Sequence, residues 1–153
     1  MRFVFVDRIL ELVPGRSAAA EHVFAGSEEF FRHHFPGFPV VPGVLLTEMM
    51  GQTAALCLDA ESRGTGRGKA ILAQIRSASF RGWVRPDETA KVRAEIKSSQ
   101  SGCATASCVA EVEGRRVCTA DLLFSFLPPG TLAPGYRDEV LESFLARRER
   151  GKD

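Results

Sequence analysis

Residues 42–62 read PGVLLTEMMGQTAALCLDAES, and this stretch decides the fold. Its one proline stands at the first position, and apolar residues would occur almost all round a helix built from it. A helix that is apolar on most sides is enclosed by the rest of its protein. Pro42 suits a helix start, and the glycines Gly64, Gly66 and Gly68 supply an end. The stretch therefore predicts one long central helix.

The segments on either side of this helix predict mainly strands. Val92, Ala94 and Ile96 alternate with charged residues, and this alternation predicts a strand with one buried and one solvent-exposed face. One buried helix followed by consecutive antiparallel strands implies an α+β fold, with the sheet wrapped around the helix. The predicted strands are 3–13, 17–24, 70–84, 90–98, 104–111 and 117–127, and residues 28–32 could form one helical turn.

The length of 153 residues fits a single domain with one core. We expect this domain to span residues 1–127. Residues 128–153 would form a linker and a C-terminal helical extension, because Pro128, Pro129 and Gly130 break the last strand. Within the extension, residues 137–150 predict an amphipathic helix whose charge run is typical of a solvated surface.

Composition excludes several classes of function. With 44% hydrophobic and 25% charged residues, the chain is a globular protein and not a disordered one. A net charge of +1 gives little electrostatic support for a nucleic-acid partner. The apolar run 3–6 is cut by Asp7 and Arg8, too short for a signal peptide or a membrane span, so we expect a cytoplasmic protein without a membrane partner.

The cysteines predict buried thiols. They show no C-x-x-C spacing and no neighbouring histidine, which argues against a zinc site or a redox pair. Cysteine in such a setting acts as a small apolar residue. The four positions are Cys57, Cys103, Cys108 and Cys118.

The loop before the central helix carries the candidate chemistry. Residues 34–42 contain three prolines, which exclude helix and sheet and predict a rigid extended loop. His34 begins this loop, and Glu48 lies inside the apolar helix, where an unpaired carboxylate is costly. Gln52, one turn further on, also allows a simpler interpretation in which Glu48 is a hydrogen-bonded structural acid. The residues alone leave both interpretations open.

Residues 34–45, HFPGFPVVPGVL, followed by Glu48 and Gln52, closely resemble the signature of the bacterial 3-hydroxyacyl-[acyl-carrier-protein] dehydratases. The upstream segment 7–15 and the downstream segment 80–86 also look like that family. The resemblance covers about residues 3–127. It departs from the family pattern at Arg32-His33, at Met49-Met50-Gly51, at Arg85 and in the segment after Pro128.

The resemblance implies a hotdog fold, in which a curved antiparallel sheet wraps one long central helix. It implies that His34 and Glu48 are the catalytic residues, and that the histidine of one subunit works with the carboxylate of the other. The partners would be an acyl carrier protein or coenzyme A thioester and further copies of the chain, as a homodimer or a larger homo-oligomer. Glutamate at position 48, where isomerising relatives carry aspartate, favours the branch that only dehydrates. No cofactor and no metal is expected.

Dehydration of a 3-hydroxyacyl thioester needs a base, an acid and a donor to the thioester oxygen. Histidine suits the base because its charge changes near neutral pH, so His34 would take the α proton. Glu48 would protonate the leaving hydroxyl, directly or through water. The Gly43 N–H at the helix start would stabilise charge on the thioester oxygen. The expected substrate-binding residues are Gly43, Val44, Gln52 and Phe35.

Two alternatives belong to other classes. An acyl-thioester hydrolase is the first, because hotdog folds host both reactions and the fold alone does not choose. Hydrolysis uses a carboxylate to aim water and would not require the pair of His34 and Glu48. A non-catalytic acyl-carrier-binding subunit is the second, and the presence of both residues argues against it. Acyl chain length and pathway stay open.

A basic surface is the expected docking site for an acidic carrier protein. Ordinary surface solubility explains the same side chains equally well. The candidate residues are Arg76, Arg81, Arg85 and Lys91.

Overall fold

The computed structural model describes residues 1–150 and contains there one six-stranded sheet, two α-helices and one 3₁₀ turn. Every neighbouring pair of strands is antiparallel, and the order across the sheet is β1-β2-β4-β5-β6-β3. The elements are β1 Arg8–Val13, β2 Ser17–Val23, the 3₁₀ turn Glu29–Arg32, α1 Gly43–Thr65, β3 Lys69–Phe80, β4 Thr89–Ser99, β5 Cys103–Val112, β6 Arg115–Leu127 and α2 Glu139–Arg150.

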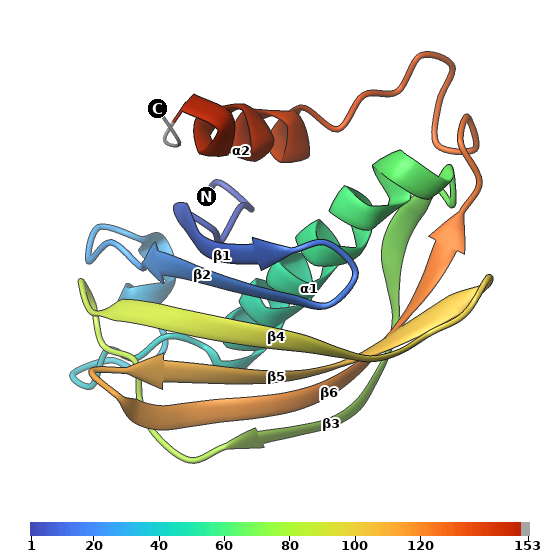
Figure 1. Cartoon of the computed structure of the whole chain (residues 1–153). Helices are drawn as coiled ribbons and strands as arrows, with labels where there is room; N and C mark the ends of the chain where they lie inside the picture. The colour runs from blue at the N-terminus through green and yellow to red at the C-terminus, as the bar shows by residue number, and fades with distance from the viewer. Residues whose placement is uncertain (151–153) are drawn as a thin grey trace.

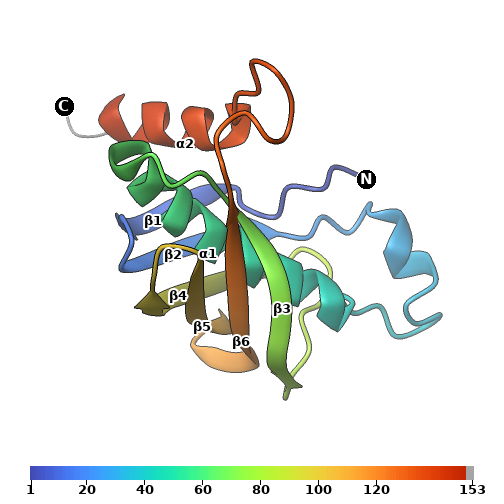
Figure 2. The ribbon, with the colours of Figure 1, turned by 90° about the vertical axis from the view of Figure 1, so that its right-hand side faces the viewer.

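The sheet curves around α1, as Figure 1 shows, and the view in Figure 2 shows α2 lying over the far end of α1. Met49, Met50 and Leu58 of α1 are fully buried against sheet residues such as Leu122 and Phe124. This is the hotdog arrangement that the family resemblance implies. It confirms the α+β prediction and the central position of the helix.

The boundaries of α1 follow from its ends. Pro42 is the N-cap residue, and the helix runs on to Thr65, three residues beyond the predicted end. Gly66 then adopts a left-handed conformation with φ of 68°, and its N–H donates to the Ser62 carbonyl at 2.7 Å. Glycine takes this conformation without steric cost, so the glycine-rich segment ends the helix as predicted.

The alternation in β4 is confirmed. Ala90, Val92 and Ala94 are buried, whereas Lys91 and Arg93 between them are exposed. One face of this strand therefore packs on α1, and the other meets solvent.

The first strand is shorter than the predicted 3–13 and begins at Arg8. The Phe5 N–H donates to Gln52 Oε1 at 2.7 Å, and Gln52 Nε2 donates to the Phe3 carbonyl at 3.3 Å. These backbone groups bind a side chain of α1, so they do not take part in a strand ladder.

The strand predicted at 70–84 is also shorter and ends at Phe80. The N–H groups of Arg81 and Gly82 both turn to the Val117 carbonyl, at 2.8 and 3.2 Å. Two consecutive donors to one acceptor end the regular ladder, and the chain leaves the sheet there.

The C-terminal helix is docked on the domain, which corrects the prediction of a solvated helix. Glu139, Arg147, Arg148 and Arg150 are exposed, but Leu141 and Phe144 are buried against Val6, Ala20 and Leu56. The helix begins at Glu139, two residues later than predicted, because Asp138 Oδ1 accepts the Leu141 N–H at 2.9 Å as a helix cap. Residues 151–153 lie outside the described residues, and the division at residue 127 stays a prediction.

Cys57, Cys108 and Cys118 are buried, as expected for small apolar residues, whereas Cys103 is only half-buried. Burial raises the pKa of the Cys108 thiol to about 12 and that of Cys118 to about 11. Neither helix described in residues 1–150 is long and apolar enough to cross a membrane.

Candidate active site

The orientation of the His34 ring defines which nitrogen is available. Its Nδ1 lies 3.1 Å from the Val40 carbonyl oxygen. A carbonyl oxygen only accepts hydrogen bonds, so Nδ1 carries the proton in the neutral ring. The unprotonated nitrogen is then Nε2, which is free to accept a proton from a substrate.

The proline-rich loop holds this histidine at both ends. The His34 N–H donates to the Phe30 carbonyl at 2.9 Å, and the Val41 N–H donates to the Val84 carbonyl at 2.8 Å. The peptide bond between His34 and Phe35 is cis, and the two rings stack with centroids 4.3 Å apart. Phe35 itself is exposed, as a substrate-contacting side chain would be.

Glu48 lies in the second turn of α1 and is half-buried. Its Oε1 accepts a hydrogen bond of 3.0 Å from Gln52 Nε2. The same glutamine is bonded to the backbone of Phe3 and Phe5, so its amide is fixed from two sides. The carboxylate is therefore oriented by a side chain that cannot turn freely.

Glu48 opens into an apolar pocket of about 260 Å³ between α1 and β3. Val44 at its rim is 72% exposed, and Phe80 opposite is 52% exposed. A single carboxylate among apolar walls is typical of a substrate site, because the walls bind and the polar group orients. The lining residues are Val44, Thr47, Glu48, Leu72, Ile75, Ala78 and Phe80.

Gly43 begins α1 beside this pocket. A Cβ atom at this position would lie 2.8 Å from two ring carbons of Phe80, which is too close for packed carbon atoms. A side chain at this position would therefore displace the Phe80 ring. Its N–H belongs to the first turn, where amide groups lack an intrahelical acceptor and the helix dipole is positive.

His34 lines a different cavity, of about 480 Å³, together with Met1, Glu29, Phe30 and His33. The structure thus brings Glu48, Val44 and Gln52 together at the start of α1. It places the predicted base in another cavity of the same chain.

The four predicted docking residues do not form one patch. All are exposed, but Arg76 lies on edge strand β3 and Lys91 on β4, with β5 and β6 between them. Arg81 and Arg85 follow β3, and the Arg85 guanidinium lies 5.9 Å from the centre of the exposed Phe38 ring. Arg85 therefore lies beside the loop that carries His34.

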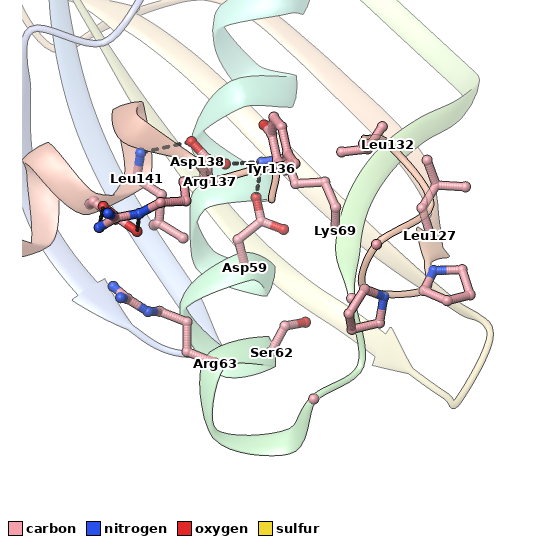
Figure 3. A pocket seen from close by; sticks show the side chains of 16 residues that line it. Asp59, Ser62, Arg63, Lys69, Leu127, Leu132, Tyr136, Arg137, Asp138 and Leu141 are labelled. Carbon is pink, nitrogen blue, oxygen red and sulfur yellow. Dashed lines mark hydrogen bonds and ion pairs between the residues drawn. The ribbon is translucent and has the colours of Figure 1, made fainter. Parts of the chain in front are cut away.

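A buried ion cluster at the other end of α1 was missed by sequence analysis. Asp59 is 3% exposed, and Lys69 Nζ donates to its carboxylate and to that of Asp138, as Figure 3 shows. Burial raises the pKa of Asp59, although Lys69 and the Ala70 N–H oppose this. The signal was available: like Glu48, Asp59 is a carboxylate within the apolar helix.

Comparison with known proteins identifies the family. The model of the FabA-like domain matches residues 1–121. The chain belongs to the FabA-like family. Within this family it is 36% identical over 121 residues to the 3-hydroxyacyl-[acyl-carrier-protein] dehydratase FabZ of Ligilactobacillus salivarius, covering 79% of this chain and 86% of that protein. It is 39% identical over 124 residues to FabZ of Roseiflexus castenholzii, covering 80% and 85%.

Solved structures of low sequence identity share the fold of this FabA-like chain. The dehydratase heterocomplex ApeI:P from Xenorhabdus doucetiae superposes with a TM-score of 0.69 at 10% identity, covering 85% of this chain and 87% of that one. A hypothetical thioesterase with coenzyme A from Streptococcus pneumoniae gives 0.63 at 12% identity, covering 79% and 85%. Since a dehydratase and a thioesterase share the fold, the fold does not choose the reaction. The relatives found by sequence are dehydratases, and they confirm the dehydratase resemblance over the hydrolase alternative.

Proposed function

We propose that this chain is a lyase of fatty acid biosynthesis that removes water from a 3-hydroxyacyl thioester and yields a trans-2-enoyl thioester. The observation that carries the proposal is Glu48, oriented by Gln52 at 3.0 Å and facing an apolar pocket. The FabZ relatives support an acyl carrier protein as the carrier of the thioester. A cytoplasmic location stays a prediction.

The roles follow from the geometry of each group. His34 Nε2 takes the α proton while Nδ1 stays bonded to the Val40 carbonyl. Glu48 gives a proton to the β hydroxyl, the C–O bond breaks, and the electrons of the former C–H bond form the new double bond. The Gly43 N–H stabilises charge on the thioester oxygen. Val44 and Phe35 supply apolar contacts to the substrate.

We infer further that the active unit is a homodimer with shared sites. In one chain His34 and Glu48 open into different cavities, so a complete site needs His34 of the partner subunit. The edge strand β3 supports this pairing, because residues 73–78 are exposed on both faces and Ile75 is 50% exposed. An open edge with apolar side chains is covered when two copies pair across a two-fold axis. Larger assemblies stay a prediction.

The test is an assay of the purified protein with 3-hydroxyacyl thioesters of several lengths. Enoyl formation, followed by its ultraviolet absorbance, is the expected result, and free thiol should stay at background. Release of thiol without an enoyl product would replace the dehydratase with a hydrolase. Binding of thioesters without either product would indicate a non-catalytic subunit.

A further inference from the structure

A pocket at the C-terminal end of α1 takes no part in the proposed reaction. The end of α1, the start of β3, the linker 128–138 and the start of α2 enclose it, as Figure 3 shows, and its volume is about 300 Å³. It shares no lining residue with the pocket of Glu48 or with the cavity of His34. Most of its lining residues follow residue 121, where the family match ends. We call it the linker pocket.

The linker that forms the outer wall of this pocket has a defined shape. Near its start, the Thr131 N–H donates to the Pro128 carbonyl at 3.1 Å. Near its end, the Tyr136 N–H donates to the Ala133 carbonyl at 3.1 Å, so the linker contains two hydrogen-bonded turns. Asp138 then caps α2 and joins the ion cluster. A wall that is already ordered lowers the cost of binding a ligand.

The linker contributes apolar side chains to the pocket. Leu132 is 43% exposed and Tyr136 is 49% exposed, although both line the pocket. Covering such side chains is favourable, so an apolar occupant would be stabilised there. Pro128 and Pro129 add two ring faces to the wall, and the Tyr136 ring can pair with another aromatic ring.

One cation of the linker pocket lacks a partner. Arg63, in the last turn of α1, forms no ion pair within residues 1–150. The other two cations are neutralised, Lys69 by the ion cluster and Arg137 by Glu142 at 2.8 Å. One unpaired guanidinium matches one carboxylate, which it can bind through two parallel hydrogen bonds. A dianion would bring its second charge close to the carboxylates of Glu142 and Asp138, which also line the pocket.

A buried hydroxyl in the same pocket also lacks a partner. Ser62 is 7% exposed, and its Oγ has no hydrogen-bond partner among the residues that the structure describes. An unsatisfied buried polar group is costly, so a ligand with a polar atom near it would be stabilised. Figure 3 shows Arg63 and Arg137 at one end of the pocket and Leu132 at the other. The pocket is therefore amphipathic, with a cationic end and an apolar end.

The volume indicates the size of the ligand. An apolar cavity of about 150 Å³ binds benzene. The linker pocket has about twice this volume, which matches a body of two fused aromatic rings.

We propose that the linker pocket binds a small aromatic monocarboxylate, with its carboxylate at Arg63 and its rings between Leu132 and Tyr136. This site is separate from the pocket of Glu48, so the inference goes beyond the proposed function and does not depend on it. It gives the C-terminal extension a role in ligand binding.

Calorimetry with 2-naphthoate tests the proposal, and 2-naphthamide is the uncharged probe of nearly the same shape. The wild-type chain should bind 2-naphthoate with a Kd tighter than about 1 mM, and should bind 2-naphthamide about tenfold more weakly. Arg63→Met removes the charge, so it should weaken the binding of 2-naphthoate about tenfold and leave 2-naphthamide unaffected. Arg148→Met, at an exposed position of α2 outside the pocket, is the matched control and should bind both probes as wild type does.

A second variant tests the apolar end of the pocket. Leu132→Ser should weaken the binding of both probes by a similar factor, roughly fivefold, because both lose the same apolar contact. Arg63 and Leu132 are both exposed, so these variants should unfold within a few degrees of wild type.

Absence of 2-naphthoate binding up to about 1 mM would overturn the proposal. Equal affinity for the two probes would also overturn it, as would unchanged 2-naphthoate affinity in Arg63→Met or Leu132→Ser, because the probe would then lie elsewhere, for example beside Glu48. The proposed function has a separate readout. A chain that binds 2-naphthoate as expected but forms no enoyl product would support the linker pocket and refute the dehydratase.

Discussion

Gln52 Nε2 donates to Glu48 Oε1 at 3.0 Å, while Gln52 Oε1 accepts the Phe5 N–H at 2.7 Å. The amide thus connects the candidate catalytic acid to the N-terminal segment. Phe5 is buried in the core, so this segment is fixed in turn. The orientation of the carboxylate depends on residues almost fifty positions away in the sequence.

Gln52→Leu should therefore lower kcat by about ten- to a hundredfold, because Glu48 loses its orienting donor. KM should change much less, since the apolar pocket walls stay in place. Steady-state kinetics on the folded variant provide the measurement. Gln100→Leu, at an exposed turn, is the control and should behave as wild type. A large rise in KM at unchanged kcat would assign Gln52 to binding only.

His34→Ala and Glu48→Gln should each lower turnover by at least ~10²-fold, the usual effect of losing a general base or acid. Both variants should keep the unfolding temperature within a few degrees of wild type. His33→Ala is a close control, because this neighbouring histidine is exposed. Near-normal enoyl formation by either folded variant would contradict the assigned role.

Mixing the two inactive variants should restore activity if the site is shared between subunits. After exchange, a heterodimer carries up to one site with both His34 and Glu48 intact. Activity should rise from background toward a quarter of the wild-type value, because half of the dimers are mixed and each has one good site. Native mass spectrometry confirms the exchange. No recovery in an exchanged sample would place both residues in one subunit.

Charge reversal at Arg81 and Arg85 should raise KM for a carrier-linked substrate several-fold and leave a short pantetheine substrate unaffected. The reason is that long-range attraction to an acidic carrier acts on association, whereas the chemistry stays the same. The effect should weaken as salt concentration rises. Lys91→Glu is the control, because Lys91 lies on β4 and is separated from β3 by β5 and β6. Equal effects on both substrates would exclude a docking role.

Lys69→Met should lower the free energy of unfolding by ~3 kcal/mol near neutral pH, because Asp59 is left as a buried unpaired carboxylate. Lys97→Met, which breaks an exposed ion pair with Glu95, should cost less than ~1 kcal/mol. Urea unfolding of both variants measures the difference.

The loss in Lys69→Met should shrink as the pH falls. Burial raises the pKa of Asp59 above its ordinary value of 3.8, so the folded chain holds this proton more tightly than the unfolded chain. That contribution is complete below pH 3.8 and is lost as the pH rises through the raised value. Without the charge of Lys69, the pKa of Asp59 rises further. The protonated carboxyl then stabilises the folded chain over a wider range of pH. A deficit that grows on acidification would contradict the burial of Asp59.

Local patterns made much of the fold predictable. The apolar run with proline before it and glycine after it defined α1, and the alternation around Val92 defined β4. The start of β1 was not predictable, because it depends on bonds between Gln52 and backbone groups of a distant segment. The docking of α2 was not predictable for the same reason, because Phe144 packs in a cluster with Leu56 and other residues far away in the sequence.

The site was predictable in its residues and less so in its arrangement. Spacing along one helix placed Gln52 beside Glu48, as the structure confirms. Sequence spacing does not predict which cavity a loop histidine faces. The separation of His34 from Glu48 within one chain is therefore seen only in the structure. The ion cluster joins Asp59 of α1, Lys69 of β3 and Asp138 just before α2, and a helix pattern alone predicts no partner for a buried acid.

About three helical turns of α1 separate Glu48 from Asp59, and distant sites of this kind act nearly independently on free energy. The two ends of the helix can therefore be altered one at a time, by evolution or by an engineer. A change in the ion cluster at Asp59 would then leave the hydrogen bond between Gln52 and Glu48 as it is. Laboratory selection on α2 alone would have the same freedom.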